Sequence, residues 1–305
     1  MLLEVYSSPW DFELLDTGDG YRLEKWGDTA PGSESLHDST NGVILVRPDP
    51  QIIWKKSLPE SEWQKAHAIF TPGKGEDKGN WTLKKPGLKS WKVRWRDVEF
   101  LLKLSPFKHT GLFAEQATNW NWMSNQLSKV NGQMSKVKIL NLFAYTGGAT
   151  MVLAKASCQV THVDASKPAL TWANENHKLN NLPSNSVRWI LDDAVKFVKR
   201  EVKRGAKYDG IIMDPPAFGH GPTGKPWKFN EDLPGLLADC VQLLSNDAKF
   251  LVINGYATNS SAIALNNLLE DAVNSRGGKI EFGELCLKQK SGRLISTGIF
   301  ARWQN

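Results

Sequence analysis

The chain has 305 residues, 41% hydrophobic and 23% charged, a composition of soluble globular proteins with one large or two ordinary domains. No apolar run reaches membrane-spanning length, and the start lacks the basic head and apolar core of a signal peptide, so we expect a cytoplasmic location. The three cysteines are odd in number and widely spaced, which favours reduced thiols over a disulfide framework or a zinc site.

The net charge of +6 is unevenly distributed. Residues 1–135 carry 17 basic and 17 acidic side chains, so the whole surplus lies further along the chain. Part of it recurs at three- and four-residue spacing along one predicted helix, as Lys196, Lys199, Arg200, Lys203, Arg204 and Lys207. This stripe is either the solvated face of an amphipathic helix or a surface that contacts the phosphates of an acidic polymer.

Residues 1–108 are expected to form a small, β-rich, antiparallel domain that recognises the target or caps the site. They contain seven of the 13 tryptophans and dense turn signals, such as Gly18-Asp19-Gly20 and Asn41-Gly42. Strand-like runs cover Tyr21–Trp26, Val43–Arg47, Gln51–Trp54 and Trp91–Leu104, and one helical pattern covers 60–70.

One run in this domain alternates between apolar and basic residues. Trp91, Val93 and Trp95 should face one side of a strand, and the basic residues the other. A basic strand face beside aromatic rings suits nucleic acid, although a half-buried strand with a solvated face has the same pattern. The basic residues Lys92, Arg94 and Arg96 are therefore candidate target-binding residues.

From residue 136 onward, strands and helices alternate, which predicts a mainly parallel sheet covered on both faces. The expected strands are 137–142, 159–163, 187–191, 208–213, 248–254, 280–287 and 293–302. The expected helices are 148–157, 166–180, 194–204, 230–245 and 259–275. Only Lys288–Gly292 separates the last two strands, so they should form an antiparallel hairpin. The prediction is an α/β, Rossmann-like, seven-stranded sheet over 136–305, preceded by a linker and helix over 109–135.

The loops at the carboxyl ends of these strands form the candidate site, since ligands bind there in open α/β sheets. After the first strand comes a turn, Phe143-Ala144-Tyr145-Thr146-Gly147-Gly148, which matches neither the G-x-G-x-x-G nor the P-loop pattern. The second strand ends at Asp164, where a carboxylate can accept hydrogen bonds from ribose hydroxyls. The third strand leads into Asp192-Asp193-Ala194, and the fourth into Asp214-Pro215-Pro216-Ala217-Phe218.

Together these motifs resemble a class I S-adenosylmethionine (SAM) methyltransferase, and more narrowly the bacterial 23S ribosomal RNA large-subunit methyltransferases. That family carries an F-x-Y-T-G-G turn and a D-P-P-x-F tip, and the resemblance covers roughly Gly111–Trp303. It includes Gly111–Gln116, which is similar to the G-x-[FY]-x-[DE]-Q segment before the SAM fold. The resemblance implies SAM as cofactor and RNA as partner. We expect no metal and no membrane partner, and the sequence leaves a monomer and a homodimer both open. The chain has no room for a complete RNA-binding domain of the PUA type.

The motifs and the resemblance give three sets of candidate residues. The cofactor set is Gln116, Asn141, Phe143, Ala144, Tyr145, Thr146, Gly147, Gly148, Asp164, Ala165, Asp192, Asp193 and Ala194. The catalytic set is Asp214, Pro215, Pro216 and Phe218, in which the aspartate accepts hydrogen bonds from a base and the ring stacks on it. The substrate set adds His220, Lys225, Asn254 and Tyr256 to the three basic residues of the N-terminal domain. Asp164 and Asp193 could instead be helix N-caps.

The expected reaction follows from a missing cysteine. Methylation of cytosine C5 needs a thiolate that adds to the ring, and family members with this activity place it after strand five. This chain has Ile253–Ala257 there, without a cysteine. We therefore expect methylation of a base nitrogen in structured RNA, ribosomal RNA first. The alternatives are methylation of a small molecule or protein, and a non-catalytic factor that binds SAM or RNA.

Overall fold

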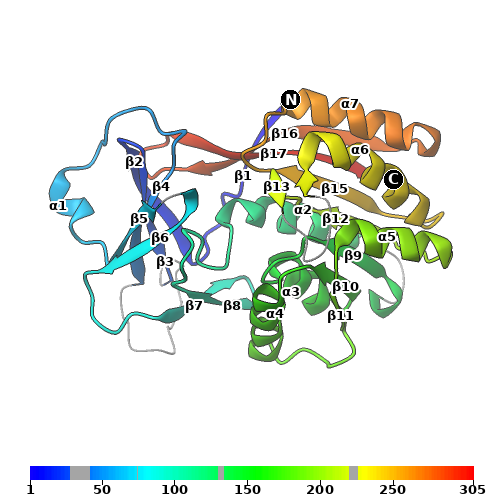
Figure 1. The fold of residues 1–305 in the computed structure, drawn as a ribbon, viewed down its shortest axis with the longest axis horizontal. Coiled ribbons are helices and arrows are strands. Elements are labelled where there is room, and N and C mark those ends of the chain that lie inside the picture. Colours follow the sequence, from blue (N-terminus) through cyan, green and yellow to red (C-terminus); the bar gives the residue numbers. More distant parts are fainter. Residues whose placement is uncertain (28–41, 74, 130–133, 220–225) are drawn as a thin grey trace. The chain divides into compact units, whose positions relative to one another are not determined.

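The structure, a computed structural model, describes residues 1–27, 42–73, 75–129, 134–219 and 226–305, and it contains two compact units (Figure 1). The larger unit comprises Met1–Glu4, Glu115–Cys286 and Ser296–Asn305. The smaller unit comprises Val5–Ala114 and Leu287–Ile295. The division therefore falls inside the segment expected to be a linker and helix, and the tip of the C-terminal hairpin groups with the smaller unit.

The larger unit is built on a mixed sheet with the order β1-β16-β17-β15-β12-β9-β10-β11. Its strands are β1 (Leu2–Val5), β9 (Lys138–Leu142), β10 (Gln159–Asp164), β11 (Val187–Leu191), β12 (Gly210–Met213), β15 (Phe250–Gly255), β16 (Lys279–Lys288) and β17 (Leu294–Gln304). The pairs from β11 to β15 are parallel, whereas β17 is antiparallel to β15. The predicted α/β sheet with an antiparallel last strand is confirmed.

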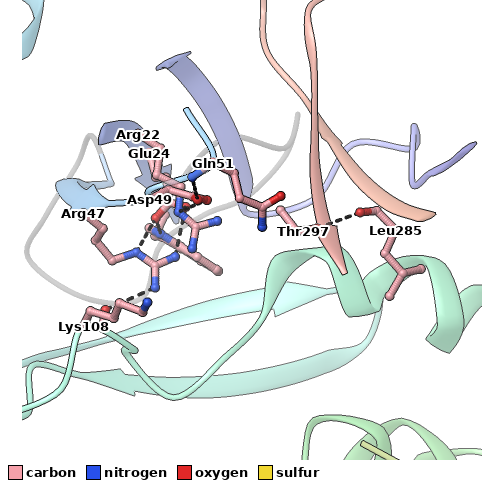
Figure 2. Close-up of polar contacts among 9 residues, drawn as sticks. Arg22, Glu24, Arg47, Asp49, Gln51, Lys108, Leu285 and Thr297 are labelled. Atoms are coloured by element: carbon pink, nitrogen blue, oxygen red, sulfur yellow. Dashed lines mark hydrogen bonds and ion pairs between the residues drawn. The ribbon is translucent and has the colours of Figure 1, made fainter. Parts of the chain in front are cut away.

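The sheet also has an eighth strand, β1, which the sequence did not predict. It lies beside β16 at Gly283, where an added Cβ would sit 1.9 Å from the carbonyl oxygen of Leu2. A glycine is therefore required at this close approach. The next pair in the sheet, β16 and β17, is joined by the Thr297 hydroxyl, which donates to the carbonyl oxygen of Leu285 at 2.9 Å (Figure 2).

Helices cover both faces of this sheet. They are α2 (Ala117–Leu127), α3 (Gly148–Lys155), α4 (Lys167–Leu179), α5 (Ala194–Lys203), α6 (Phe229–Leu243) and α7 (Ala262–Val273), with 3₁₀ turns at Ala114–Gln116, Met134–Lys136 and Asn274–Arg276. Leu140 and Leu142 belong to the core shared with α5, α6 and α7, whereas Asn141 between them bonds to Thr150 of α3. This alternation puts α3 on the opposite face, where it contacts α2 and α4. None of the helices in the described ranges could span a membrane.

The smaller unit contains a five-stranded sheet with the order β2-β3-β4-β5-β6, and a separate hairpin of β7 and β8. The elements are β2 (Phe12–Gly18), β3 (Tyr21–Trp26), β4 (Val43–Pro48), the one-turn helix α1 (Glu60–Trp63), β5 (Ala68–Gly73), β6 (Gly75–Leu83), β7 (Ser90–Trp95) and β8 (Val98–Lys103). The predicted small β domain is confirmed, with one departure. Strands β4 and β5 pair in parallel, and the other pairs of the five-stranded sheet are antiparallel.

Three expected elements of this unit were wrong. Gln51–Trp54 is not a strand, and the helix expected over 60–70 is a single turn followed by β5, because pairing with β4 and β6 outweighs the helical pattern. The run Trp91–Leu104 is two strands separated by a turn. The alternation within β7 is confirmed, since Trp91, Val93 and Trp95 are buried. Arg96 lies in the turn, with a positive φ of 53°, rather than on the face of the strand.

A cluster of buried charges occupies the interior of the smaller unit (Figure 2). Its members, Arg22, Glu24, Arg47 and Asp49, are each no more than 4% exposed. Two nitrogens of Arg47 bind the Glu24 carboxylate at 2.7 and 2.9 Å, and the third donates to the carbonyl oxygen of Lys108 at 3.2 Å. Arg22 lies 3.2 Å from Glu24 and 4.0 Å from Asp49. We call these four residues the charge cluster.

Candidate functional site

The turn after β9 is held in an uncommon backbone conformation. Phe143, Tyr145 and Gly147 have positive φ values of 53°, 50° and 84°. A positive φ strains the backbone of Phe143 and Tyr145, which carry a Cβ, whereas glycine adopts it readily. The amide of Tyr145 donates to Oδ2 of Asp164 at 2.7 Å, and the ring of Phe143 lies 5.2 Å from that of Trp227. These contacts from β10 and from the fourth strand tip keep the turn in one shape.

Buried side chains support this turn from beneath. The amide of Asn141 donates to the Thr150 hydroxyl at 2.9 Å, and that hydroxyl lies 2.9 Å from Nδ1 of His162. Burial lowers the pKa of His162 to about 3, so the ring is neutral. The carbonyl oxygen of Thr146 accepts from the Asn176 amide at 2.9 Å. Asn141 and Thr146, both predicted to bind the cofactor, thus have buried partners within the protein.

Asp164 stands at the end of β10 with capacity left on its carboxylate. Its two oxygens accept from the backbone amides of Tyr145, at 2.7 Å, and Ser166, at 2.8 Å. Burial raises the pKa of Asp164, while these two hydrogen bonds act in the opposite direction. The N-cap of α4 is Ser166, so the capping alternative for Asp164 is wrong. Each carboxylate oxygen can accept a second hydrogen bond, which suits a ribose diol.

The acidic pair after β11 has structural partners. Asp193 is the N-cap of α5, accepting from the Lys196 amide at 2.9 Å, so the capping alternative is confirmed here. Asp192 accepts from the Asp193 amide at 2.8 Å and pairs with Arg200. The preceding Leu191 is 50% exposed, and an aliphatic side chain there offers an apolar surface for a flat ring. The sequence signal that we missed is this leucine directly before the acids.

A second residue that we missed, Trp227, fixes the fourth strand tip. The indole of Trp227 donates to the carbonyl oxygen of Pro216 at 2.7 Å. The short strands β13 (Phe218–Gly219) and β14 (Trp227–Lys228) pair in antiparallel fashion. Phe218 is 73% exposed, so its ring is available for stacking. Because Trp227 also contacts the ring of Phe143, it connects the first and fourth strand tips.

One carboxylate oxygen of Asp214 accepts a hydrogen bond from the protein, and the other oxygen is available. Its Oδ2 accepts from the side-chain amide of Gln116 at 3.1 Å. Within the described part of the chain, its Oδ1 accepts no hydrogen bond. Burial and then the nearby Glu115 carboxylate raise the pKa of Asp214 to about 7. This carboxyl can therefore exchange a proton near neutral pH.

The remaining predicted residues divide into four groups. Asn254 is 3% exposed, and its amide bonds with Gln116 and Asn119, whereas Tyr256 is partly exposed after β15. Lys92, Arg94 and Arg96 belong to the smaller unit. His220 and Lys225 lie outside the described residues. Ala144, Gly148, Ala165, Ala194 and Pro215 lie in the strand tips where they were expected.

All three cysteines are poor nucleophiles. Each is buried, in α6 for Cys240, in β16 for Cys286 and just before β10 for Cys158. Burial, with a smaller contribution from Asp209, raises the pKa of Cys158 to about 12. Burial and Glu284 raise that of Cys286 to about 11, and burial also raises the pKa of Cys240. A thiolate is therefore scarce at neutral pH.

In the large sheet, β17 lies between β15 and β16 and is antiparallel to β15. This topology, with a strained turn and acidic residues at the strand tips, defines the class I methyltransferase fold. A SAM-dependent methyltransferase from Agrobacterium tumefaciens is 37% identical, with 100% of this chain and 93% of that one covered and a TM-score of 0.90. The ribosomal RNA large subunit methyltransferase K/L of Shewanella sp. strain MR-4 is 33% identical over 161 residues, which are 52% of this chain and 21% of that one. This chain thus spans about a fifth of such curated relatives.

The model of the S-adenosylmethionine-dependent methyltransferase family matches residues 63–281, so the chain belongs to this family. The structure of SMU.776 with SAH bound is similar in fold, at 16% identity and a TM-score of 0.66 over 97% of this chain and 76% of that one. The predicted family and its cofactor, SAM, are confirmed.

The residues present fit this cofactor. Asp164 retains acceptor capacity for the ribose, and the half-exposed Leu191 offers an apolar contact for the adenine ring. The turn from Phe143 to Gly148 would hold the methionine end through backbone groups.

Proposed function

We propose that this protein transfers a methyl group from SAM to a nitrogen of a base in structured RNA, with ribosomal RNA as the first candidate. The observation that carries the proposal is the fourth strand tip, in which Asp214 has an available oxygen and Phe218 an exposed ring. The curated relatives that match half of this chain are named ribosomal RNA large subunit methyltransferases. A cytoplasmic location follows from this substrate.

For this reaction the protein must align the base nitrogen with the methyl group and accept a proton from that nitrogen. When bound, SAM supplies an electrophilic methyl group in line with the attacking atom. Asp214 Oδ1 would accept the hydrogen bond, and then the proton, of the base nitrogen, since its pKa lies near 7. Phe218 would stack on the base, and Trp227 would hold the tip through the carbonyl oxygen of Pro216.

The choice of nitrogen over carbon is supported by the cysteines. Attack by C5 of cytosine needs a thiolate that adds to the ring first, and Cys158, Cys240 and Cys286 are all buried with raised pKa values. A nitrogen has its own lone pair and needs only alignment and a proton acceptor.

The smaller unit is proposed to recognise the RNA. Its strand β7 exposes Arg94 and half-exposes Lys92, while Trp91, Val93 and Trp95 are buried on the other side. Phosphates would be attracted to the basic side. Residues 1–108 would thus serve recognition and residues 136–305 catalysis.

Methyl transfer from isotope-labelled SAM to total RNA from cells that lack this gene tests the proposal, with nucleosides resolved by mass spectrometry. We expect label in an N-methylated guanine or adenine. Label in 5-methylcytosine would overturn the choice of nitrogen. Absence of label in RNA, with SAM binding intact by calorimetry, would overturn RNA as the substrate.

A further inference from the structure

A row of side-chain amides, half-buried at Gln116 and buried at Asn119 and Asn254, connects Asp214 to an arginine. Gln116 donates to Asp214 at 3.1 Å and accepts, through Oε1, from the amides of Asn119 at 3.0 Å and Asn254 at 3.4 Å. Asn119 also donates to Oδ1 of Asn254 at 2.8 Å, and its own oxygen accepts from Arg302 at 3.3 Å. Asn119, Asn254 and Arg302 are each no more than 3% exposed. The row therefore connects α2, β15 and β17 to the fourth strand tip.

Arg302 determines the direction of every hydrogen bond in this row. A guanidinium only donates, so the side-chain oxygen of Asn119 must face it and the Asn119 nitrogen must face away. That nitrogen then requires acceptors, which are the oxygens of Gln116 and Asn254. With its oxygen engaged, Gln116 can turn only its nitrogen toward Asp214. The orientation of the Gln116 amide thus follows from a cation that is two hydrogen bonds away, through Asn119.

The arginine itself is rigidly held. It lies 3.2 Å from the Glu281 carboxylate and 3.1 Å from that of Glu4. Its guanidinium lies over two rings, 4.8 Å from the centre of Trp122 and 4.5 Å from that of Phe300. A buried guanidinium that is paired and stacked in this way is held in one orientation, so the direction in which it donates to Asn119 is also fixed.

We propose that Gln116, Asn119 and Arg302 are positioning residues that keep an N–H donor on one oxygen of Asp214 and leave its other oxygen for the substrate. This inference rests on the proposed function, in which Asp214 receives the N–H of the base. Without Arg302 or the Asn119 donor, Gln116 could rotate its oxygen toward the carboxylate. The carboxylate would then lose its donor and meet the repulsion of a carbonyl dipole.

The proton affinity of Asp214 should respond to this donor. A hydrogen bond to the charged form of a carboxyl lowers its pKa, so loss of the bond raises it further. Among the described residues, Glu115 is the charged group that also acts on Asp214, and it raises the pKa in the same sense. By this principle, the hydrogen bond from Gln116 acts on the pKa of Asp214 in the direction opposite to burial and Glu115.

Two near-isosteric variants test the inference. Gln116→Met removes the donor, and Asn119→Asp keeps the contact with Arg302 while removing the N–H that orients Gln116. Matched controls on the same helix are Gln126→Met and Asn125→Asp, whose side chains are partly or fully exposed. We would measure kcat and KM for RNA, SAM affinity, and the titration of Asp214 by carboxyl ¹³C NMR, with Asp214→Asn used to assign the resonance.

We expect kcat to fall about tenfold or more in both variants, with SAM affinity and the KM for RNA changed less than about twofold. The double variant should be no slower than Gln116→Met alone, because Asn119 acts through Gln116. The Asp214 midpoint should rise by about one pH unit in both variants and in neither control.

An unchanged Asp214 midpoint, or additive losses in the double variant, would overturn the inference. The NMR titration needs no RNA, so it separates the two proposals. If the wild type methylates no RNA while the midpoint rises in the variants, the proposed substrate fails and the positioning role stands.

Discussion

Two buried arginine networks, one in each unit, differ in where their hydrogen bonds end. In the charge cluster of the smaller unit, Arg47 and Glu24 satisfy each other through two hydrogen bonds. In the larger unit, Arg302 leads through amides to Asp214, which has an oxygen without a donor among the described residues. A network that closes on itself stabilises a fold, whereas one that ends at an available atom can act on a ligand.

The largest expected effect is a loss of stability when the charge cluster loses its central carboxylate. Burial would raise the pKa of Glu24, but Arg47 and Arg22 outweigh it and hold the pKa below its ordinary value. Glu24→Gln leaves both arginines without a counter-charge, so the free energy of unfolding should fall by about 3–5 kcal/mol in urea titrations. Glu62→Gln, which breaks an exposed pair with Lys65, should cost less than about 1 kcal/mol. Equal losses for the two variants would show that the charge cluster is not structural.

Asp164 tests whether the strand tips bind the cofactor. Asp164→Ala removes a buried acceptor that we assign to the ribose, so SAM affinity should fall about 10- to 100-fold in calorimetry. The control is Asp271→Ala, an exposed acid on α7. Unchanged SAM affinity in Asp164→Ala would remove this residue from the cofactor site.

The two networks also predict opposite responses to pH. Since the pKa of Asp214 is raised to about 7 and the ionised form is the acceptor, kcat should fall about tenfold per pH unit below that value and level off above it. Glu24 has a lowered pKa, so its contribution to stability is present above its ordinary value of 4.5 and is lost only as pH falls through the folded value. Unfolding by denaturant at each pH separates the two effects, and a flat kcat profile between about pH 5.5 and 8 would exclude Asp214 as the acceptor.

The smallest expected effect is a change in RNA affinity when a charge on the surface of the smaller unit is reversed. Arg94→Glu reverses one charge on the exposed side of β7, so RNA affinity should fall several-fold. The slope of the logarithm of the binding constant against the logarithm of the salt concentration should become shallower by about one. Lys65→Glu, which replaces a residue of the exposed α1 pair, serves as the control. An identical salt dependence in Arg94→Glu and the wild type would place the RNA elsewhere.

Sequence patterns predicted the parts of the fold that local chemistry determines. The alternating runs and turn signals located the parallel strands of the larger unit, and the Asp214-Pro215-Pro216 segment was correctly placed at the end of the fourth of them. The β1 strand escaped prediction because its four residues pair with a strand about 280 positions away. For the same reason, the sequence analysis assigned no role to Arg302, since its partners come from α2, β16 and β1.

The most direct test of the account is methyl transfer by Asp214→Ala, measured beside its SAM affinity. If the fourth strand tip performs the chemistry, the rate should fall at least about 100-fold while SAM binds as in the wild type. Asp247→Ala, an exposed acid shortly before β15, should keep the full rate. Unchanged turnover in Asp214→Ala would contradict the assignment of this tip as the active site.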